Sequence, residues 1–304
     1  MIKNEIIALE EMKRCDPEDF IYRLLNYQQQ ISNNPDLYYH EKEDRHWIKS
    51  YYKNISIRKE VLFKQYHKLV SETHENIYPY FYSKDHFLYT WVDLHPNGKL
   101  FSIYSGEPID SQAMIEQDFI TLQKRYDSYH RLFHQDELHE EIDEEMIERL
   151  RNISKQHRFN TEHVIPQSWF HAKEPMKGDL HHLFVCEPTC NNLRSNYPFH
   201  EYDPSNSSVQ QESICGKQDL SGFEPAYGKG IVARATFYFL LRYPNSIHKK
   251  HLKRIHLPTL RKWHHQEPVS LYEKHRNKAI YEIQGNRNPF IDIPDLIDHL
   301  RFSF

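Results

Sequence analysis

The spacing of apolar residues changes repeatedly along this 304-residue chain, and that change constrains its fold more than any other feature. Residues 5–80 show helical spacing, as in Phe20-Ile21-Leu24-Leu25 and Val61-Leu62-Tyr66-Leu69-Val70, where apolar side chains recur three or four positions apart. A second helical pattern covers residues 110–156. It ends in an acidic stretch, Glu137–Glu148, which is typical of a solvated helix face.

A segment rich in strand-forming residues lies between these helical regions. Phe87–Asp93 and Lys99–Ser105 contain Tyr, Thr, Trp, Val and Ile, and they flank His95-Pro96-Asn97-Gly98. An Asn-Gly pair between two such runs is typical of a tight turn between antiparallel strands. The sequence therefore predicts a β-hairpin here.

A third pattern begins near Phe159. Short apolar strands are expected at Val164-Ile165 and at residues 180–185, followed by a helix at Glu187–Asn196. Pro188 suits the first turn of that helix, and Asn196 followed by Pro198 suits its end. Beyond it we expect a polar loop, a strongly apolar helix and a turn-rich polar cluster, at His200–Ser221, Gly228–Tyr243 and Gln284–Pro289.

These patterns predict an α+β protein. No linker-like segment separates the predicted hairpin from the later strands, so we expect one mixed α/β domain at residues 86–304, with a helical N-terminal arm at residues 1–85. Only 38% of the residues are hydrophobic, but there are 21 Tyr, 17 Phe and 4 Trp. Each aromatic side chain can bury ~150–250 Å², which favours a folded chain over a disordered one.

The chain shows no signal for membrane insertion or export. No run approaches the ~18 consecutive apolar residues of a membrane span, and residues 1–11 lack the apolar core of a secretory signal. As written, the sequence predicts a cytoplasmic protein without a membrane partner.

The net charge of −4 says little about partners, but its distribution is uneven. Leu241–Lys262 holds seven basic residues and no acidic one. One interpretation is a solvated basic helix face. The other is an electrostatic footprint for nucleic-acid phosphates, in which Lys249, Lys250, Lys253 and Arg254 would bind the substrate.

Three of the four cysteines, Cys186, Cys190 and Cys215, fall within thirty residues, and Cys15 stands alone. Reduced thiols are the default in a chain without an export signal. The Cys186-x3-Cys190 spacing with Cys215 would need one more ligand for a structural zinc site. Buried free thiols, one disulfide and a zinc site all remain open.

A carboxylate, an amide and an imidazole lie close together in the sequence of the region that begins near Phe159. Glu162 and His163 precede Pro166, and Asn191 lies near the start of the expected helix. Strand neighbours point to opposite faces, so Glu162 and His163 share a site only where the strand ends or bulges. Carboxylate and amide oxygens suit Mg²⁺, Ca²⁺ or Mn²⁺, and a neutral imidazole can take a proton from water. The set suggests one-metal phosphodiester hydrolysis.

The sequence of these segments resembles the bacterial endonuclease I family of His-Me finger (ββα-metal) nucleases. Within that family it is most similar to the extracellular ribonuclease-like members of Gram-positive bacteria. The similarity spans roughly residues 86–293. The motifs that resemble the family are Asn160–Phe170 (NTEHVIPQSWF), Gly178–Leu183 (GDLHHL), Asn191–Asn196 (NNLRSN), Phe223–Pro225, Lys229–Ala235, Pro268–Ser270 and Gln284–Phe290 (QGNRNPF).

The resemblance implies a ββα-metal core at about residues 159–198. His163 would be the general base, and Glu162 and Asn191 would hold one divalent ion, Mg²⁺ or else Mn²⁺ or Ca²⁺. It also implies cleavage of DNA and RNA with little sequence preference, leaving 5′-phosphate ends.

Two departures from the family pattern stand out. Some relatives hold the cleaved phosphate with an Arg between the base and the second strand, whereas Phe170–Asp179 offers only Lys173 and Lys177, of which we take Lys177 as the stand-in. Lys supplies a point charge and not a bidentate fork. Many relatives are secreted, so an active nuclease kept inside a cell would need an inhibitor protein, a leader or another export route.

Four further motif residues, Arg194, Arg234, Asn286 and Asn288, are assigned supporting roles. For the two arginines, structural ion pairs are favoured over phosphate contacts, and the Gln284–Pro289 cluster is favoured as a hydrogen-bonded turn that supports the site. Either His181 or His182 could orient the catalytic imidazole.

Two rival functions are weighed against the nuclease. A non-catalytic nucleic-acid-binding module could keep the same scaffold, but the complete set of Glu162, His163 and Asn191 argues against it. A zinc peptidase is disfavoured because the sequence contains no His-Glu-x-x-His and the candidate ligands are oxygens.

Overall fold

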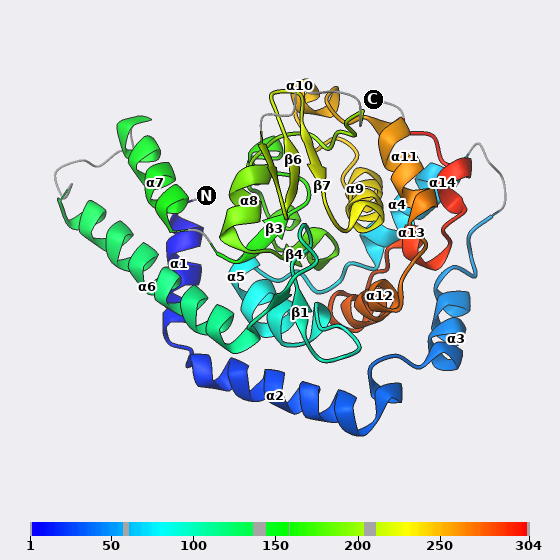
Figure 1. Cartoon of the computed structure of the whole chain (residues 1–304), viewed down its shortest axis with the longest axis horizontal. Helices are drawn as coiled ribbons and strands as arrows, with labels where there is room; N and C mark the ends of the chain where they lie inside the picture. The colour runs from blue at the N-terminus through cyan, green and yellow to red at the C-terminus, as the bar shows by residue number, and fades with distance from the viewer. Residues whose placement is uncertain (1, 57–60, 136–143, 158, 204–210, 303–304) are drawn as a thin grey trace.

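The structure is a computed structural model that describes residues 2–56, 61–135, 144–157, 159–203 and 211–302. The fold is α+β, with many helices and short antiparallel strands in separate small sheets. Figure 1 shows the strands β3, β4, β6 and β7 near the centre, with α1, α6 and α7 on one side and α9 and α11–α14 on the other.

The N-terminal region is helical, as predicted: α1 (Ile2–Lys13), α2 (Pro17–Asn33), α3 (Glu41–Tyr51) and α4 (Leu62–Glu72). Asp16 caps α2 by accepting a hydrogen bond from the Glu18 N–H at 3.0 Å, and Pro17 occupies its first turn. Helix α2 packs on residues 83–92, and α4 packs on α9 (Lys229–Arg242). The predicted domain boundary at residue 85 stays a prediction.

The second predicted helical region is also confirmed, as α6 (Ser111–Gln135) and α7 (Glu144–Gln156). Part of the predicted acidic face, residues 137–143, lies outside the described residues.

The predicted hairpin at residues 87–105 is wrong. Residues 80–92 form the short helix α5 (Tyr80–Tyr82) and a π-helical segment, η3 (Ser83–Val92). Only β1 (Leu100–Phe101) is a strand, and it pairs with β2 (Pro108–Ile109) instead.

The physical reason lies in what surrounds η3. Leu88, Tyr89 and Val92 are fully buried, and the buried Lys84 donates to Asp118 of α6 at 2.9 Å. Tyr89 donates to the same carboxylate at 2.6 Å. β-propensity measures how well a side chain fits a pleated, half-buried surface. This segment packs mainly against helices and is not paired with any strand, so its aromatic and β-branched residues pack as a buried helix.

Two further sheets follow. β3 (Thr161–His163) pairs antiparallel with β4 (Leu183–Val185), and β5 (Gln211–Ser213), β6 (Gly216–Gln218) and β7 (Phe223–Pro225) form a three-stranded sheet. The expectation of an unstructured loop over His200–Ser221 is therefore wrong where β5 and β6 lie; residues 204–210 are outside the described part of the chain.

The predicted helix near residue 190 is confirmed as α8 (Pro188–Arg194), with Pro188 in its first turn. The C-terminal third adds α10 (Lys249–Leu252), α11 (Leu257–Gln266), α12 (Leu271–Gln284), α13 (Pro289–Asp292) and α14 (Leu296–His299) around α9. Helix α9 is buried along most of its length, which explains its strongly apolar sequence. Within the described residues, no helix is both long and apolar enough to cross a membrane.

A buried arginine of α9 is paired with polar groups of neighbouring elements. Arg234 donates to Glu273 of α12 at 2.9 Å (Nη2–Oε2) and to the Glu267 carbonyl at 2.8 Å. Next to this ion pair, His264 is 3% exposed, and its Nε2 lies 3.0 Å from the Pro294 carbonyl oxygen. Burial, and after it the charge of Arg234, lowers the pKa of His264 to about 4.

This buried histidine predicts acid sensitivity. Below pH ~6.5, His264 binds a proton in the unfolded chain but not in the folded protein. The free energy of unfolding should therefore fall by ~3 kcal/mol because of His264 as the pH drops from ~6.5 to ~4. His264→Gln should flatten that slope in urea unfolding curves recorded across this range. The matched control is His265→Gln at the exposed neighbouring position, and equal slopes for the two variants would contradict the assignment.

Candidate active site

The candidate site is built where β3 ends. The register pairs Glu162 with Phe184 and His163 with Leu183 of β4. β3 ends at His163, three residues before Pro166, as expected for this pair of residues. The strand predicted at Val164-Ile165 is wrong, because both residues lie beyond the end of β3. Helix α8 follows β4 directly and packs against β3.

Glu162 is a buried carboxylate with strong partners. It is 3% exposed, and its Oε1 accepts a hydrogen bond from the Tyr104 hydroxyl at 2.7 Å. Arg194 Nε lies 3.2 Å from the same oxygen. The guanidinium also donates to the carbonyls of Val164 and Ser195, so it connects the end of β3 to the end of α8. The predicted structural ion pair of Arg194 is confirmed.

His163 has a defined proton arrangement. Its Nε2 lies 2.9 Å from the Lys177 carbonyl oxygen, which can only accept, so Nε2 bears the proton of the neutral ring. Nδ1 is then an acceptor, and Gln167 Nε2 donates to it at 3.2 Å. Burial, and after it the neighbouring His182, holds the pKa of His163 well below its ordinary value. The ring is therefore neutral near pH 7 and can accept a proton at Nδ1.

The turn that supplies the Lys177 carbonyl is fixed by a second carboxylate. Glu174 accepts from the N–H groups of Gly178 at 2.7 Å and Tyr80 at 3.0 Å. The Lys177 ammonium lies over the rings of Tyr80 and Phe81, at 5.3 and 5.4 Å from their centroids. The structure thus brings the Lys177 backbone to His163 and directs its charge toward an aromatic pair.

Asn191 lies beside Glu162 along the backbone. Its Nδ2 donates to the carbonyl of Thr161 at 2.8 Å, the residue directly before Glu162. Its side-chain oxygen is therefore the one atom it can offer to a cation. Asn191 thus bonds to the backbone at the start of β3, and Glu162 and His163 are the next two residues of that strand.

The two histidines of the DLHHL motif point to different partners. The His182 ring lies 5.4 Å from that of His163, at 70°, but its Nε2 bonds to the Met176 carbonyl. His181 contacts the Asn286 carbonyl at 3.2 Å and the Tyr238 ring. His182 is thus the one beside the candidate base, and the contact is between rings and not a hydrogen bond.

The polar cluster at Gln284–Pro289 forms hydrogen bonds with the residues that precede β4. Gln284 accepts from the Leu180 N–H at 2.8 Å and donates to Asp179 at 3.1 Å. Asn286 donates to the Tyr238 hydroxyl at 2.7 Å, and Asn288 donates to the Arg234 carbonyl at 3.2 Å. These side chains are buried, as expected for a hydrogen-bonded turn, and Arg234 forms the ion pair with Glu273 that its structural role predicts.

The basic stretch adjoins the segment that follows His163. The His248 N–H donates to the Trp169 carbonyl at 3.0 Å, and the His251 ring stacks on the Trp169 indole at 5.1 Å. The guanidinium of Arg254 lies 5.9 Å from that indole. The four candidate substrate-binding side chains are all exposed: Lys249, Lys250, Lys253 and Arg254. Trp169 itself is buried.

The chain was also compared with known proteins. The endonuclease I family model matches residues 66–295. The chain belongs to the endonuclease I family.

Curated relatives of this endonuclease I chain bear nuclease names. It is 33% identical over 158 residues to an extracellular ribonuclease of Bacillus amyloliquefaciens (47% of this chain, 53% of the relative). It is 32% identical over 124 residues to an extracellular deoxyribonuclease of Aeromonas hydrophila (38% and 50%), and 26% over 162 residues to Endonuclease-1 of Buchnera aphidicola (46% and 64%). The chain thus spans about half the length of the first relatives it matches.

The expectation of a cytoplasmic protein finds no support in the relatives' names, because the ribonucleases are called extracellular and a further relative from Aeromonas hydrophila is called a periplasmic deoxyribonuclease. One of the three cysteine states is settled as well: Cys190 and Cys215 form a disulfide, and Cys15 and Cys186 are free thiols.

Sequence reasoning about this endonuclease I chain missed two site residues. Tyr104 reaches Glu162 from 58 positions away, and no local signal marks it. Gln167 is part of the NTEHVIPQSWF motif and lies one helical turn after His163, but a strand followed by Pro166 gave no reason to expect it to fold back.

The buried pair of Arg194 and Glu162 predicts a strong asymmetry in stability. Arg194→Met leaves a buried carboxylate without its cation, and we expect the free energy of unfolding to fall by ~3–5 kcal/mol. Adding Glu162→Gln to that variant removes the stranded charge and should recover part of the loss. A full double-mutant cycle in urea measures the coupling. Strictly additive losses would show that the two groups do not interact.

Proposed function

We propose that this chain is a divalent-metal-dependent endonuclease that hydrolyses DNA, RNA or both with little sequence preference and leaves 5′-phosphate ends. The observation that supports this best is the end of β3. This strand carries the Glu162 carboxylate and the His163 imidazole with its accepting Nδ1, the Asn191 amide bonds to the backbone of the strand, and a basic segment is bonded to Trp169. Membership of the endonuclease I family and the relatives' nuclease names support the same proposal.

Glu162 and Asn191 suit a hard cation by their chemistry. Both offer oxygen, and the Asn191 amide nitrogen is already used in its bond to Thr161. A bound Mg²⁺, or Mn²⁺ or Ca²⁺ in its place, would neutralise charge on the scissile phosphate and on the departing 3′-oxygen, with water and phosphate oxygens as its remaining ligands.

His163 would act as the general base. Its Nε2–H is held by the Lys177 carbonyl, which fixes the ring and leaves Nδ1 to take a proton from water. The deprotonated water oxygen attacks phosphorus, the bond to the 3′-oxygen breaks, and the phosphate stays on the 5′ side. Gln167 donates to Nδ1, so its amide must give way to the attacking water.

The exposed cations of residues 249–254 would bind phosphates along the strand. They follow His248, whose backbone is bonded to the segment directly after the base. Lys177 is the proposed contact to the cleaved phosphate, since its backbone lies against His163.

The experiment that tests the proposal separates base from ligand. Plasmid DNA and total RNA are incubated with the chain in Mg²⁺, Mn²⁺, Ca²⁺ or EDTA, and we expect degradation that EDTA abolishes. Glu162→Ala and Asn191→Ala should each raise the metal concentration needed for half-maximal rate. His163→Ala should keep metal and nucleic-acid binding but lose ~10²–10⁴-fold in rate, the usual contribution of a general base.

His46→Ala, at an exposed position on α3, is the control and should retain the parental rate. Intact substrates with every metal would overturn the proposal and favour a binding module. Loss of metal binding in His163→Ala but not in Glu162→Ala would mean that the two roles are reversed.

Salt dependence tests the basic segment separately. If its side chains contact phosphates, affinity for duplex DNA should fall steeply with salt. Neutralising Lys249, Lys250, Lys253 and Arg254 with Gln should flatten the slope of log K against log[salt] by ~0.9 per lost contact. Lys42→Gln with Lys49→Gln on α3 removes two exposed positive charges outside this segment and is the control for loss of charge as such. An unchanged slope in the fourfold variant would place the phosphate contacts elsewhere.

A further inference from the structure

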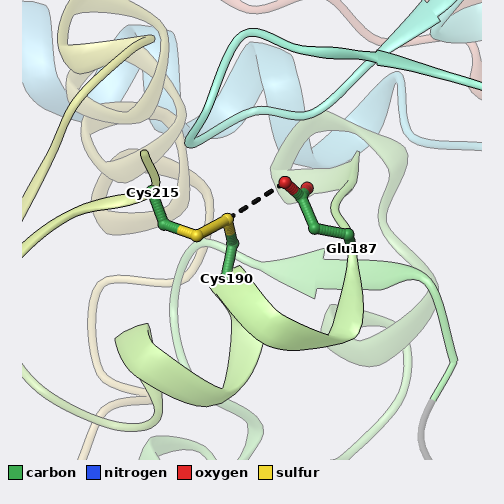
Figure 2. Close-up of side chains that lie close together, drawn as sticks. All are labelled: Glu187, Cys190 and Cys215. Atoms are coloured by element: carbon green, nitrogen blue, oxygen red, sulfur yellow. Dashed lines mark hydrogen bonds between the residues drawn. A yellow bond between two sulfur atoms is a disulfide. The ribbon is translucent and has the colours of Figure 1, made fainter. Parts of the chain in front are cut away.

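A second group of metal-ligating side chains lies at the start of α8, apart from the proposed Glu162–Asn191 site. Glu187 precedes α8, Cys190 lies in its first turns, and Cys215 lies between β5 and β6. One ligand atom from each lies within 4.8 Å of the others. Figure 2 shows the three side chains pointing toward one another. Cys190 and Cys215 are buried and joined by a disulfide.

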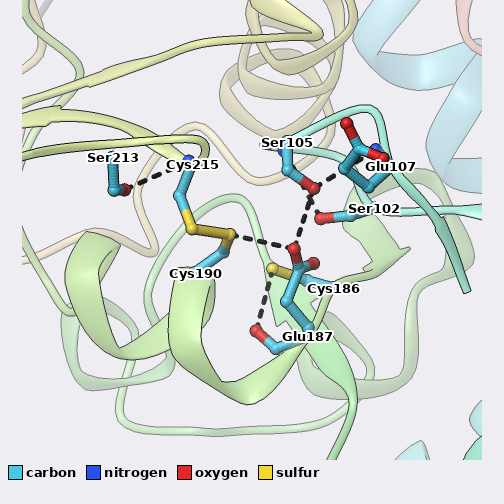
Figure 3. The surroundings of a disulfide bond; sticks show 8 residues. All are labelled: Ser102, Ser105, Glu107, Cys186, Glu187, Cys190, Ser213 and Cys215. Atoms are coloured by element: carbon cyan, nitrogen blue, oxygen red, sulfur yellow. Dashed lines mark hydrogen bonds between the residues drawn. A yellow bond between two sulfur atoms is a disulfide. The ribbon is translucent and has the colours of Figure 1, made fainter.

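The Glu187 carboxylate is poorly satisfied next to that disulfide. Ser105 Oγ donates to Oε1 at 2.8 Å, and Cys190 Sγ lies 3.1 Å from the same oxygen (Figure 3). A thiol at that place donates a hydrogen bond, but a disulfide sulfur has no proton to give. The other oxygen, Oε2, is buried and has no hydrogen-bond partner among the described residues. A buried carboxylate oxygen without a partner costs free energy.

We propose that reduction of Cys190–Cys215 creates a zinc site whose protein ligands are the two thiolates and the Glu187 carboxylate. Two sulfurs and one oxygen suit Zn²⁺ and not Mg²⁺ or Ca²⁺, which prefer oxygen alone. A cation there gives Glu187 the partner that it lacks beside the disulfide. Three protein ligands leave one tetrahedral position for water.

The chemistry balances with a dithiol as reductant. The dithiol supplies two electrons and two protons, is itself oxidised to a disulfide, and leaves Cys190 and Cys215 as thiols. Zinc then replaces the two thiol protons, which go to solvent.

The backbone already holds these ligands together. The Cα atoms of Cys190 and Cys215 are 5.2 Å apart. Cys215 lies between β5 and β6, and Ala226 donates from its N–H to the Cys215 carbonyl at 3.1 Å. Two ligands come from the start of α8, so breaking the S–S bond need not separate the three groups. Cys186 bonds to the Glu187 carbonyl instead and is not one of the ligands.

The test is zinc uptake by the full chain, with no assay of nuclease activity. Protein reduced with a phosphine under anaerobic conditions and oxidised protein are each dialysed against Zn²⁺, and bound metal is measured by mass spectrometry. We expect about one ion per reduced chain and loss of that uptake after oxidation. In Cys190→Ser, Cys215→Ser and Glu187→Gln the reduced-state uptake should be lost or weakened, whereas Cys186→Ala and Glu107→Gln should keep it.

Co²⁺ provides a readout on the unmodified chain that does not depend on the folding of variants. Its thiolate charge-transfer absorption should appear on addition to reduced protein and be absent from oxidised protein. Three results would overturn the proposal: no zinc uptake by the reduced chain, equal uptake by the oxidised chain, or a cobalt spectrum without thiolate absorption. None of them bears on the proposed nuclease, whose ligands are Glu162 and Asn191.

Discussion

The buried carboxylate of Asp179 determines how the parts of this fold meet. Its Oδ2 accepts from the hydroxyls of Tyr238 at 2.8 Å and Tyr243 at 2.9 Å, and its Oδ1 accepts from the His181 N–H at 3.0 Å and Gln284 at 3.1 Å. Burial alone raises the pKa of this carboxyl, but the neighbouring histidines and the amide hold that pKa below its usual range. An ionised group can stay inside a protein only when its lone pairs are satisfied in this way. Helix α9, the end of α12 and the start of β4 are thereby joined, and β4 positions β3.

The three- to four-residue spacing of apolar residues predicted the helices of residues 5–80 and 110–156 well, because these helices bury one face and expose the other. Helix α8 was predicted instead from Pro188 at its start, and α9, which is buried on nearly every side, from its long apolar run. Apolar spacing failed at Ser83–Val92, where burial is not restricted to one face and a Lys–Asp pair is interior. A residue list rich in Tyr, Trp, Thr and Val cannot distinguish a strand from a helix enclosed by other helices, because the outcome depends on which neighbours arrive. The strands β5 and β6 were missed because they are three residues each and polar.

The candidate site was predictable as far as it is local. Glu162 and His163 are adjacent in the sequence, and the motif that contains Asn191 lies within 30 positions; in the structure Asn191 bonds to the backbone of the same strand. The groups that form hydrogen bonds with Glu162 and His163 were not predictable in this way. The Tyr104 hydroxyl and the Lys177 carbonyl reach the site only through the tertiary fold. Which of His181 and His182 faces the base also depended on the short helix that precedes β4, because alternation does not apply there.

The Glu162 carboxylate already contacts Tyr104 and Arg194, and this affects the proposed chemistry. In the structure its charge is balanced by Arg194, whose other N–H groups hold the ends of β3 and α8. A divalent cation on the same carboxylate would place three positive charges around one negative charge in a buried site, which is unfavourable without further anions. A scissile phosphate supplies that anion. Cation and nucleic acid would therefore bind with positive coupling, each strengthening the other by the same factor. Under the proposed function, Arg194 would then have two effects: it would stabilise the fold around Glu162, and it would weaken metal binding until the substrate is present.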